Sequence, residues 1–360
     1  MTTTENDAAV QRLYDDFASA GLLPLWTQTG DLMPVEPRPT ALPHVWHWKD
    51  IYPLAQRAGE LVPVGRGGER RAIALANPGM AGQPYATPTL WAALQYLGPR
   101  EAAPAHRHTQ GAFRFILQGE GVWTVVDGDP VAMRPGDLLL TAGWAWHEHH
   151  NTGAEPMVWL DGLDIPLVRQ LDAGFFEFGP DEITDRSTPD RSRSERLWGQ
   201  PGLRPVASAA TRTPNSPLAA YRWAQTDAAL SAQLELESEG HDDGAVVEPG
   251  HAAVRYSNPT TGRDALAEMR MEMHRLSPGT RTRTRREVGS AVWQVFTGEA
   301  TIQLGDQAFS VRDGDLFVVP SWCPLGIETH SRLDAFRFTD APVYEALNLA
   351  RTAEGKDPST

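Results

Sequence analysis

The chain has 360 residues, of which 41% are hydrophobic, and a formal net charge of −14 at pH 7. A surplus of acidic residues repels nucleic-acid phosphates and anionic lipid headgroups, so the composition argues against a nucleic-acid partner and against membrane binding. The single cysteine, Cys323, excludes an intramolecular disulfide and is typical of a reducing cytoplasm. The sequence contains no run of 18 apolar residues and no N-terminal pattern of a signal peptide, so we expect a cytoplasmic protein.

The first 85 residues are predicted to form a helix followed by an extended arm. Apolar residues recur at helical spacing in AAVQRLYDDFASAGLL, and Gly21 is a suitable stop signal near its end. The segment 34–63 is rich in proline and tryptophan, which favours an arm that packs on another domain or another subunit.

From about residue 87 the pattern changes to short β-runs separated by Gly, Pro and Asp. GEGVWTVVDGDPVAMRPGDLLLTAGW (119–144) aligns with GEATIQLGDQAFSVRDGDLFVVPSW (298–322) with one residue of gap. A repeat of this length, with its turn glycines in register, predicts two copies of one β-domain. The predicted order is a first barrel over 86–180, a linker with a short helix near 228–236 over 181–254, a second barrel over 255–345 and a tail over 346–360.

Two pairs of histidines are candidates for a metal site. His106 and His108 are two residues apart in a predicted strand, and His147 and His149 repeat this spacing about forty residues later. Side chains at i and i+2 point to the same face of a strand, so a barrel that joins the two strands places up to four imidazoles together. Such a pair can also be an ordinary surface or core pair, but the third histidine after a Pro-Gly-Asp turn favours a metal. Imidazole ligands alone do not select among Fe, Zn, Cu and Ni.

These segments resemble the two motifs of cupins, which are double-stranded β-helix, or jelly-roll, barrels. The first motif corresponds to HxH followed by Gly119, and the second to Gly143, the next histidine and Asn151. The position at which cupins usually carry a glutamate ligand is Ala112 here. The resemblance implies an all-β-dominated chain with two cupin barrels and an N-terminal helical arm. The predicted metal ligands are three neutral side chains: His106, His108 and His147.

A closer resemblance is to gentisate 1,2-dioxygenases and their salicylate- and 1-hydroxy-2-naphthoate-cleaving relatives. It rests on AHRHTQGAFRF, PGDLLLTAGWAWHEH and WLDGLDIPLV, together with TPTLWAALQYLGP, SERLWGQPGLRP and NPTTG. The family implies a homotetramer, one Fe(II) per chain on three histidines, and ring cleavage between the carboxyl- and hydroxyl-bearing carbons, which converts gentisate and O2 into maleylpyruvate. The chemistry agrees, because a 2-hydroxybenzoate offers a carboxylate and a phenolate oxygen to one ion, and O2 needs a redox-active metal.

Several alternatives stay open at this point. Within the family, the substrate can instead be salicylate, a substituted salicylate or 1-hydroxy-2-naphthoate. Outside it, a non-catalytic cupin that senses or stores a small molecule would need no O2, and neither would a metal-dependent isomerase or decarboxylase.

Further residues are predicted to line the metal site. Arg114 has an even offset from His108, so it shares the ligand face if the strand stays in phase through Thr109-Gln110-Gly111, and it can then hold the substrate carboxylate; its alternative role is a rim ion pair. The resemblance implies that His149 donates to the substrate or oxygen and that Asp161 is an active-site acid; a fourth metal ligand or a core histidine, and a structural hydrogen bond to a loop, are their alternative roles. The basic segment GRGGERR can close over an anionic substrate or be a solvated loop. Ala93 lies between the pocket residues Trp91 and Gln95, and its small side chain affects the space available to the substrate. The full predicted set is Trp91, Ala93, Gln95, Arg114, His149 and Asp161, with Arg66 and Arg70 from the basic loop.

The repeat also provides an internal control. In the second copy, the positions that match the three ligands are Arg285, Glu287 and Leu325. None of these is an imidazole, so the sequence predicts a second barrel without a metal. We expect that barrel to pack against the first one and to build the oligomer.

Overall fold

The computed structural model describes residues 3–28, 32–62, 64, 71–179, 189–241 and 244–355, and it divides into two compact units, 1–38 and 39–360. The first unit contains α1 (Thr3–Ser19), which confirms the helix predicted there, and a 3-10 turn η1 (Leu25–Thr27). The second unit contains the two β-domains. Within the described ranges, no helix has the length and apolar character that crossing a bilayer requires.

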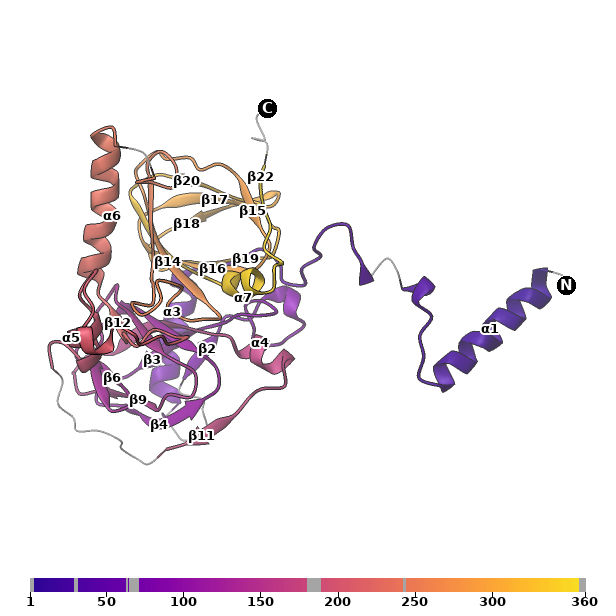
Figure 1. Ribbon diagram of the computed structural model, residues 1–360, viewed down its shortest axis with the longest axis horizontal. Helices are drawn as coiled ribbons and strands as arrows, with labels where there is room; N and C mark the ends of the chain where they lie inside the picture. The colour runs from indigo at the N-terminus through magenta and orange to yellow at the C-terminus, as the bar shows by residue number, and fades with distance from the viewer. Residues whose placement is uncertain are drawn as a thin grey trace. The chain divides into compact units, whose positions relative to one another are not determined.

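The first barrel consists of two antiparallel sheets (Figure 1). One has the strand order β12-β8-β5-β10-β3-β2 and the other β11-β4-β9-β6-β7. The strands are β2 (Ala72–Ala74), β3 (Trp91–Leu97), β4 (Ala102–His108), β5 (Ala112–Gln118), β6 (Val122–Val126), β7 (Asp129–Ala132), β8 (Leu138–Thr141), β9 (His147–Asn151), β10 (Met157–Leu163), β11 (Phe176–Phe178) and β12 (Ala220–Tyr221).

The second barrel has the same plan, with sheets β1-β19-β16-β21-β14-β13 and β18-β17-β20-β15-β22. Its strands are β1 (His44–Trp46), β13 (His251–Arg255), β14 (Arg270–Leu276), β15 (Arg285–Glu287), β16 (Ala291–Thr297), β17 (Ala300–Leu304), β18 (Gln307–Val311), β19 (Leu316–Val319), β20 (Leu325–Thr329), β21 (Leu333–Thr339) and β22 (Thr352–Glu354). The unit 39–360 as a whole contains the helices α3 (Trp48–Leu61), α4 (Ile165–Gln170), α5 (Arg193–Trp198), α6 (Trp223–Ser238) and α7 (Ala341–Ala346), with 3-10 turns η2 (Pro78–Met80) and η3 (Val206–Ser208). The predicted all-β-dominated fold of two jelly-roll domains is confirmed.

The backbone repeats as the sequence alignment predicts. Trp144 and Trp322 both adopt the left-handed conformation, with φ of 67° and 64°. The Trp144 backbone N–H donates to the His108 carbonyl at 2.7 Å, and the Trp322 N–H donates to the Glu287 carbonyl, also at 2.7 Å. This tight turn therefore fixes the end of β4 against the start of β9, and likewise β15 against β20.

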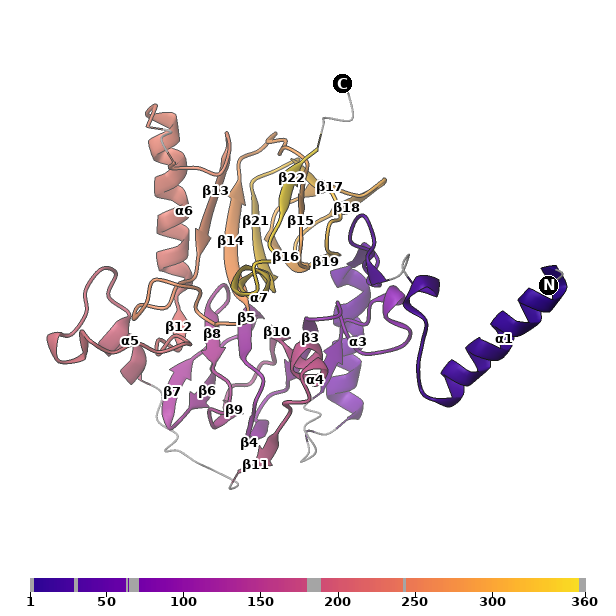
Figure 2. The ribbon, with the colours of Figure 1, turned by 45° about the vertical axis from the view of Figure 1, so that its right-hand side comes forward.

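Two helices connect the barrels crosswise (Figure 2). The strand β1 pairs with β19 of the second barrel, yet α3, which follows it, packs on β3 of the first barrel. Conversely, β12 pairs with β8 of the first barrel, and α6 packs on β13 and β14 of the second. Each helix begins on an aspartate of the repeated turn, because Asp315 accepts from the Trp48 N–H at 2.8 Å and Asp137 from the Trp223 N–H at 2.9 Å.

Aromatic side chains fill the contact between the barrels. Phe115 of β5 stacks on Phe336 of β21 with ring centroids 4.3 Å apart, and Phe113 meets Phe338 edge-on at 4.8 Å. All four are completely buried. Since successive strand residues alternate between faces, the residues between these phenylalanines point into their own barrels. The expected packing of the second barrel on the first is confirmed.

Candidate active site

The three predicted ligands lie together inside the first barrel. One ring nitrogen from each of His106, His108 and His147 forms a group whose atoms all lie within 4.8 Å of one another. β4 supplies the first two residues and β9 the third, and His106 pairs directly with His147 in the strand register. Two nitrogens bound to one ion at 2.0–2.1 Å are roughly 3–4 Å apart, so the three imidazoles are close to a metal-binding arrangement. It is the one such group in the described ranges.

Backbone carbonyls set the tautomer of each imidazole. The Nδ1 atom of His106 lies 3.1 Å from the Pro104 oxygen, that of His108 lies 3.0 Å from the Gln110 oxygen, and that of His147 lies 3.1 Å from the Ala145 oxygen. A carbonyl oxygen only accepts, so each Nδ1 carries the proton and donates it. The lone pair is then on Nε2 in all three rings. This pattern of outer hydrogen bonds is the one that orients metal-bound histidines.

No carboxylate belongs to this histidine group. Ala112, at the position of the usual cupin glutamate, is buried and pairs with Leu163. Glu148 lies next in sequence to His147, but its carboxylate contacts His150, 3.3 Å away. A divalent ion held by the three imidazoles would therefore keep its full positive charge. The donor set fits a borderline metal ion with open positions for an anionic ligand.

Arg114 and Asp161 form a buried pair beside the histidines. They are direct neighbours in the register of β5 and β10, and Arg114 Nε lies 3.6 Å from Asp161 Oδ1. The Arg114 Nη1–H also donates to Thr141 Oγ1 at 2.7 Å. Burial lowers the pKa of Arg114, and the adjacent carboxylate acts in the opposite direction. The carboxylate thus provides the partner that a buried guanidinium requires.

A cavity of about 660 Å³ opens between the two sheets at this point. This volume lies within the range of small-molecule sites, roughly 300–1,000 Å³. Its polar wall comes from both sheets and consists of His108, Gln110, Gln95, Arg114 and Asp161. Its apolar wall includes Trp91, Leu163, Ile165, Phe176 and Phe178. An aromatic acid would find a charged end and a hydrophobic end in the same cavity.

Two other predicted residues lie beneath the cavity surface. His149 follows His147 on the same face of β9 and is completely buried, with its ring 5.4 Å from that of Trp159. Ala93 is also completely buried and pairs with Asp161 across β3 and β10. Ala93 is therefore adjacent to a residue that lines the cavity, and His149 is adjacent to the predicted ligand His147, with ring centroids 6.1 Å apart. Arg66 and Arg70 lie outside the described residues.

The strand β11 was not predicted from the sequence. Phe176 of this strand stacks on His106 with ring centroids 5.5 Å apart, and β11 pairs with β4 along the ligand strand. The alternating FEF pattern was the available signal, but three residues are too few to identify a strand. The motif residue Asn151 has a structural role here, because its amide donates to the Gly98 carbonyl at 2.8 Å.

The equivalent positions of the second barrel contain no imidazole. Arg285 pairs with Leu325 in the strand register, as His106 pairs with His147 in the first barrel. Glu287 occupies the position that matches His108. The residues that the sequence alignment matches between the two copies therefore also occupy equivalent positions in the two folded barrels.

Comparisons with known proteins agree with this site. The cupin domain model matches residues 93–163. A gentisate 1,2-dioxygenase from Streptomyces sp. is 65% identical over 360 residues, which is 99% of each chain. A 5-aminosalicylate 1,2-dioxygenase from Comamonas sp. is 35% identical, over 94% of this chain and 88% of the relative.

Among solved structures, salicylate 1,2-dioxygenase from Pseudoaminobacter salicylatoxidans, in adducts with gentisate, superposes with a TM-score of 0.94. It is 55% identical, over 97% of this chain and 94% of the other. Both the sequence and the fold therefore match from end to end. The chain belongs to the family of gentisate and salicylate 1,2-dioxygenases.

Proposed function

We propose that this protein is an Fe(II)-dependent gentisate 1,2-dioxygenase, which cleaves gentisate with O2 to maleylpyruvate between the carboxyl- and hydroxyl-bearing ring carbons. The observation that carries the proposal is 65% identity to a gentisate 1,2-dioxygenase over 99% of the chain. The group of three histidines supports it, since this is the ligand set expected of the family.

His106, His108 and His147 would hold the iron through Nε2, with each Nδ1–H donating to a backbone carbonyl. When bound there, Fe(II) would supply the redox chemistry that lets O2 react with a closed-shell aromatic ring. The residues of the chain provide the remaining functions, which are binding, orientation and exclusion of water. We propose one iron per chain, in the first barrel.

Arg114 is proposed to bind the substrate carboxylate. Its guanidinium lies on the cavity wall beside the histidines and is already desolvated. A charged hydrogen bond in such a place contributes roughly 1.5–3 kcal/mol. Asp161 would orient the guanidinium from the neighbouring strand, and its negative charge would keep Arg114 from binding anions too tightly for turnover.

The other proposed roles follow from position. Gln95 lines the polar wall and would donate to a ring hydroxyl, while Trp91 would contact the ring face. His149 would donate to the substrate or to oxygen from beneath, and Ala93 would leave room for ring substituents. Arg66 and Arg70 are proposed to interact with the anionic substrate. The family resemblance supports a homotetramer, and the single cysteine supports a cytoplasmic location.

The alternative within the family is a salicylate or substituted-salicylate 1,2-dioxygenase. The 55% identity to a salicylate 1,2-dioxygenase favours this candidate. The two functions differ in whether a hydroxyl para to the phenolate is needed, because that group raises the electron density of the ring.

Oxygen consumption separates the candidates. Protein loaded anaerobically with Fe(II) is mixed with gentisate or with salicylate, and O2 uptake is followed together with the absorbance of the ring-opened keto acid. We expect one O2 per gentisate and little uptake with salicylate. Comparable uptake with both substrates would assign the chain to the salicylate group.

A control with Zn(II) tests the reaction class. Zn(II) occupies histidine sites but has no redox chemistry, so the zinc form should consume no O2. If gentisate disappears without O2 in either form, the protein is an isomerase or decarboxylase. If the iron form binds gentisate without converting it, a non-catalytic sensor is the better description.

A further inference from the structure

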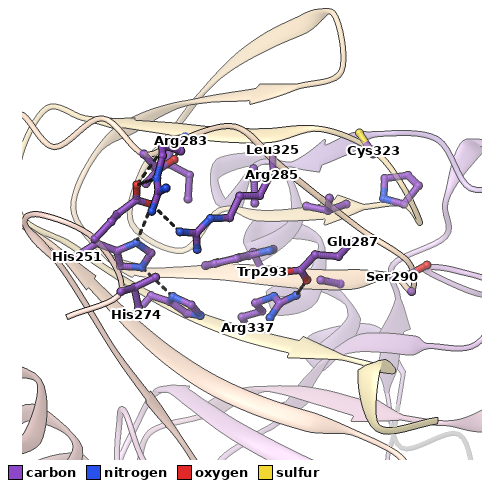
Figure 3. Close-up of a pocket in the computed structure, with 18 residues that line it drawn as sticks. His251, His274, Arg283, Arg285, Glu287, Ser290, Trp293, Cys323, Leu325 and Arg337 are labelled. Carbon is purple, nitrogen blue, oxygen red and sulfur yellow. Dashed lines mark hydrogen bonds and ion pairs between the residues drawn. The ribbon is translucent and has the colours of Figure 1, made fainter. Parts of the chain in front are cut away.

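The second barrel retains a cavity at the place that the metal site occupies in the first (Figure 3). The cavity has a volume of about 100 Å³ and lies between the two sheets of the barrel. Arg285 and Leu325, which match two of the metal ligands, both line it, as does Trp293 at the position that matches Arg114. The repeat has thus exchanged its metal ligands for other side chains without filling the space.

Most of the charged side chains around this cavity form hydrogen bonds or ion pairs with one another. Arg337 donates to both Glu272 and Glu287. Glu248 accepts from the Arg283 backbone N–H at 3.0 Å, and Arg283 Nη1 donates to Glu354 at 3.1 Å. These contacts leave the carboxylates balanced by neighbouring arginines.

Arg285 differs from the other two arginines. It forms only long ion pairs, with Glu248 and Glu354 at 3.9 Å each, which is beyond hydrogen-bond distance, and its side chain is 34% exposed. Among the residues that the structure describes, its guanidinium makes no hydrogen bond. Figure 3 shows this side chain extending into the cavity between His251 and Trp293. A cation in this position can form a close, two-pronged pair with an additional carboxylate.

Trp293 offers a buried donor on the same cavity wall. Its side chain is 4% exposed, and its indole Nε1–H has no hydrogen-bond partner in the described part of the chain. The indole nitrogen only donates, so it requires an acceptor, and leaving it buried without one is unfavourable. The apolar part of the wall includes Val319, Leu325 and Ile327, and the imidazoles of His251 and His274 also line the cavity.

We propose that the second barrel binds a small aliphatic carboxylate, whose oxygens pair with Arg285 and accept from Trp293 while its carbon chain contacts Leu325 and Ile327. The volume limits the ligand, because an engineered cavity that binds benzene has a volume of roughly 150 Å³. A carboxylate of about two to four carbons fits 100 Å³, whereas gentisate and other ring acids do not. The site is therefore distinct from the cavity of the first barrel and does not depend on its proposed activity.

Propionate is a suitable probe, and fluorine NMR of the metal-loaded protein labelled with 5-fluorotryptophan reports on the site. The Trp293 resonance is identified by its loss in Trp293→Phe. We expect this resonance to shift saturably with propionate, with a Kd on the order of 1 mM for so small a ligand. Benzoate should leave it unshifted.

Two arginine variants locate the carboxylate. Arg285→Gln should raise the Kd roughly 10- to 100-fold, because a charged hydrogen bond is lost. Arg286→Gln, one residue along β15 and not on the cavity wall, should leave it unchanged. The tryptophan resonances outside the cavity show whether each variant is folded.

Leu325→Phe provides a second test that does not remove a charge, since the larger ring should fill the cavity and abolish the shift. No saturable shift in the unmodified protein up to about 50 mM propionate would overturn the proposal. An unchanged Kd in Arg285→Gln, or an undiminished shift in Leu325→Phe, would also overturn it.

Discussion

Arg114→Gln is the substitution that separates a structural role of the guanidinium from a role in substrate binding. The side chain is 2% exposed, donates to Thr141 at 2.7 Å and lies 3.6 Å from Asp161. Removing one partner of a buried ion pair leaves the other charge uncompensated, at a cost of roughly 3–5 kcal/mol in the free energy of unfolding. We therefore expect the melting temperature to fall by several degrees.

Activity should fall for a different reason. If Arg114 binds the substrate carboxylate, the loss of roughly 1.5–3 kcal/mol lowers kcat/KM for gentisate by about 10- to 150-fold. The iron content should stay at one per chain, because Arg114 is not a ligand. The assays are O2 uptake, metal analysis and thermal unfolding of the same preparations.

The double variant Arg114→Gln/Asp161→Asn provides the decisive comparison. Neither residue is then charged, so the unfolding free energy should recover most of its loss while kcat/KM stays low. Arg134→Gln, an exposed arginine in the same barrel, is the matched control and should change neither quantity. Recovery of kcat/KM together with stability in the double variant would refute a substrate-binding role for Arg114.

Other outcomes follow from the same structure. His147→Ala should lose bound iron with the fold retained, whereas Glu287→Ala in the second barrel should leave the metal content unchanged; metal analysis of both distinguishes the barrels. Burial and the nearby Glu268 raise the pKa of Asp164 to about 7, so the folded state binds more protons than the unfolded state between about pH 4 and 7. The Asp164 contribution to stability is thus present below pH 4 and lost as the pH rises through 7. Asp164→Asn should therefore be more stable than the unmodified protein at pH 8 but not at pH 4. The gain in the free energy of unfolding, measured by chemical denaturation, should be at most about 4 kcal/mol. Asp315→Ala should destabilise the protein by about 1 kcal/mol, because α3 loses its N-terminal cap.

Local patterns were sufficient to predict the repeat and the paired histidines, and the cupin resemblance selected three of the four as ligands. The i, i+2 spacing of His106 and His108 fixes their common face whatever the rest of the fold does. The turn glycines and aspartates of the two copies are set by backbone geometry within a few residues, as the matching φ angles of Trp144 and Trp322 illustrate. These features therefore appear in the sequence without knowledge of long-range contacts.

Other features depend on which strands become neighbours. Arg114 and Asp161 are far apart in sequence, and only the β5–β10 register makes them a pair. The crossing of α3 and α6 between the barrels depends on the tertiary position of the Asp137 and Asp315 turns. Phe176 reaches the site through a three-residue strand that has no stability of its own away from β4.

The second barrel contributes to the first site although it lacks metal ligands. Phe113 and Phe115 flank Arg114 on β5, and both are held against the phenylalanines of β21. On the neighbouring strand, Gly162 follows Asp161, and a Cβ there would lie 2.1 Å from the Phe113 ring. Side chains on one face of a strand fix the direction of those on the other. The position of the Arg114–Asp161 pair in the cavity is therefore set from outside the first barrel, and the two barrels act as one structural unit in placing it.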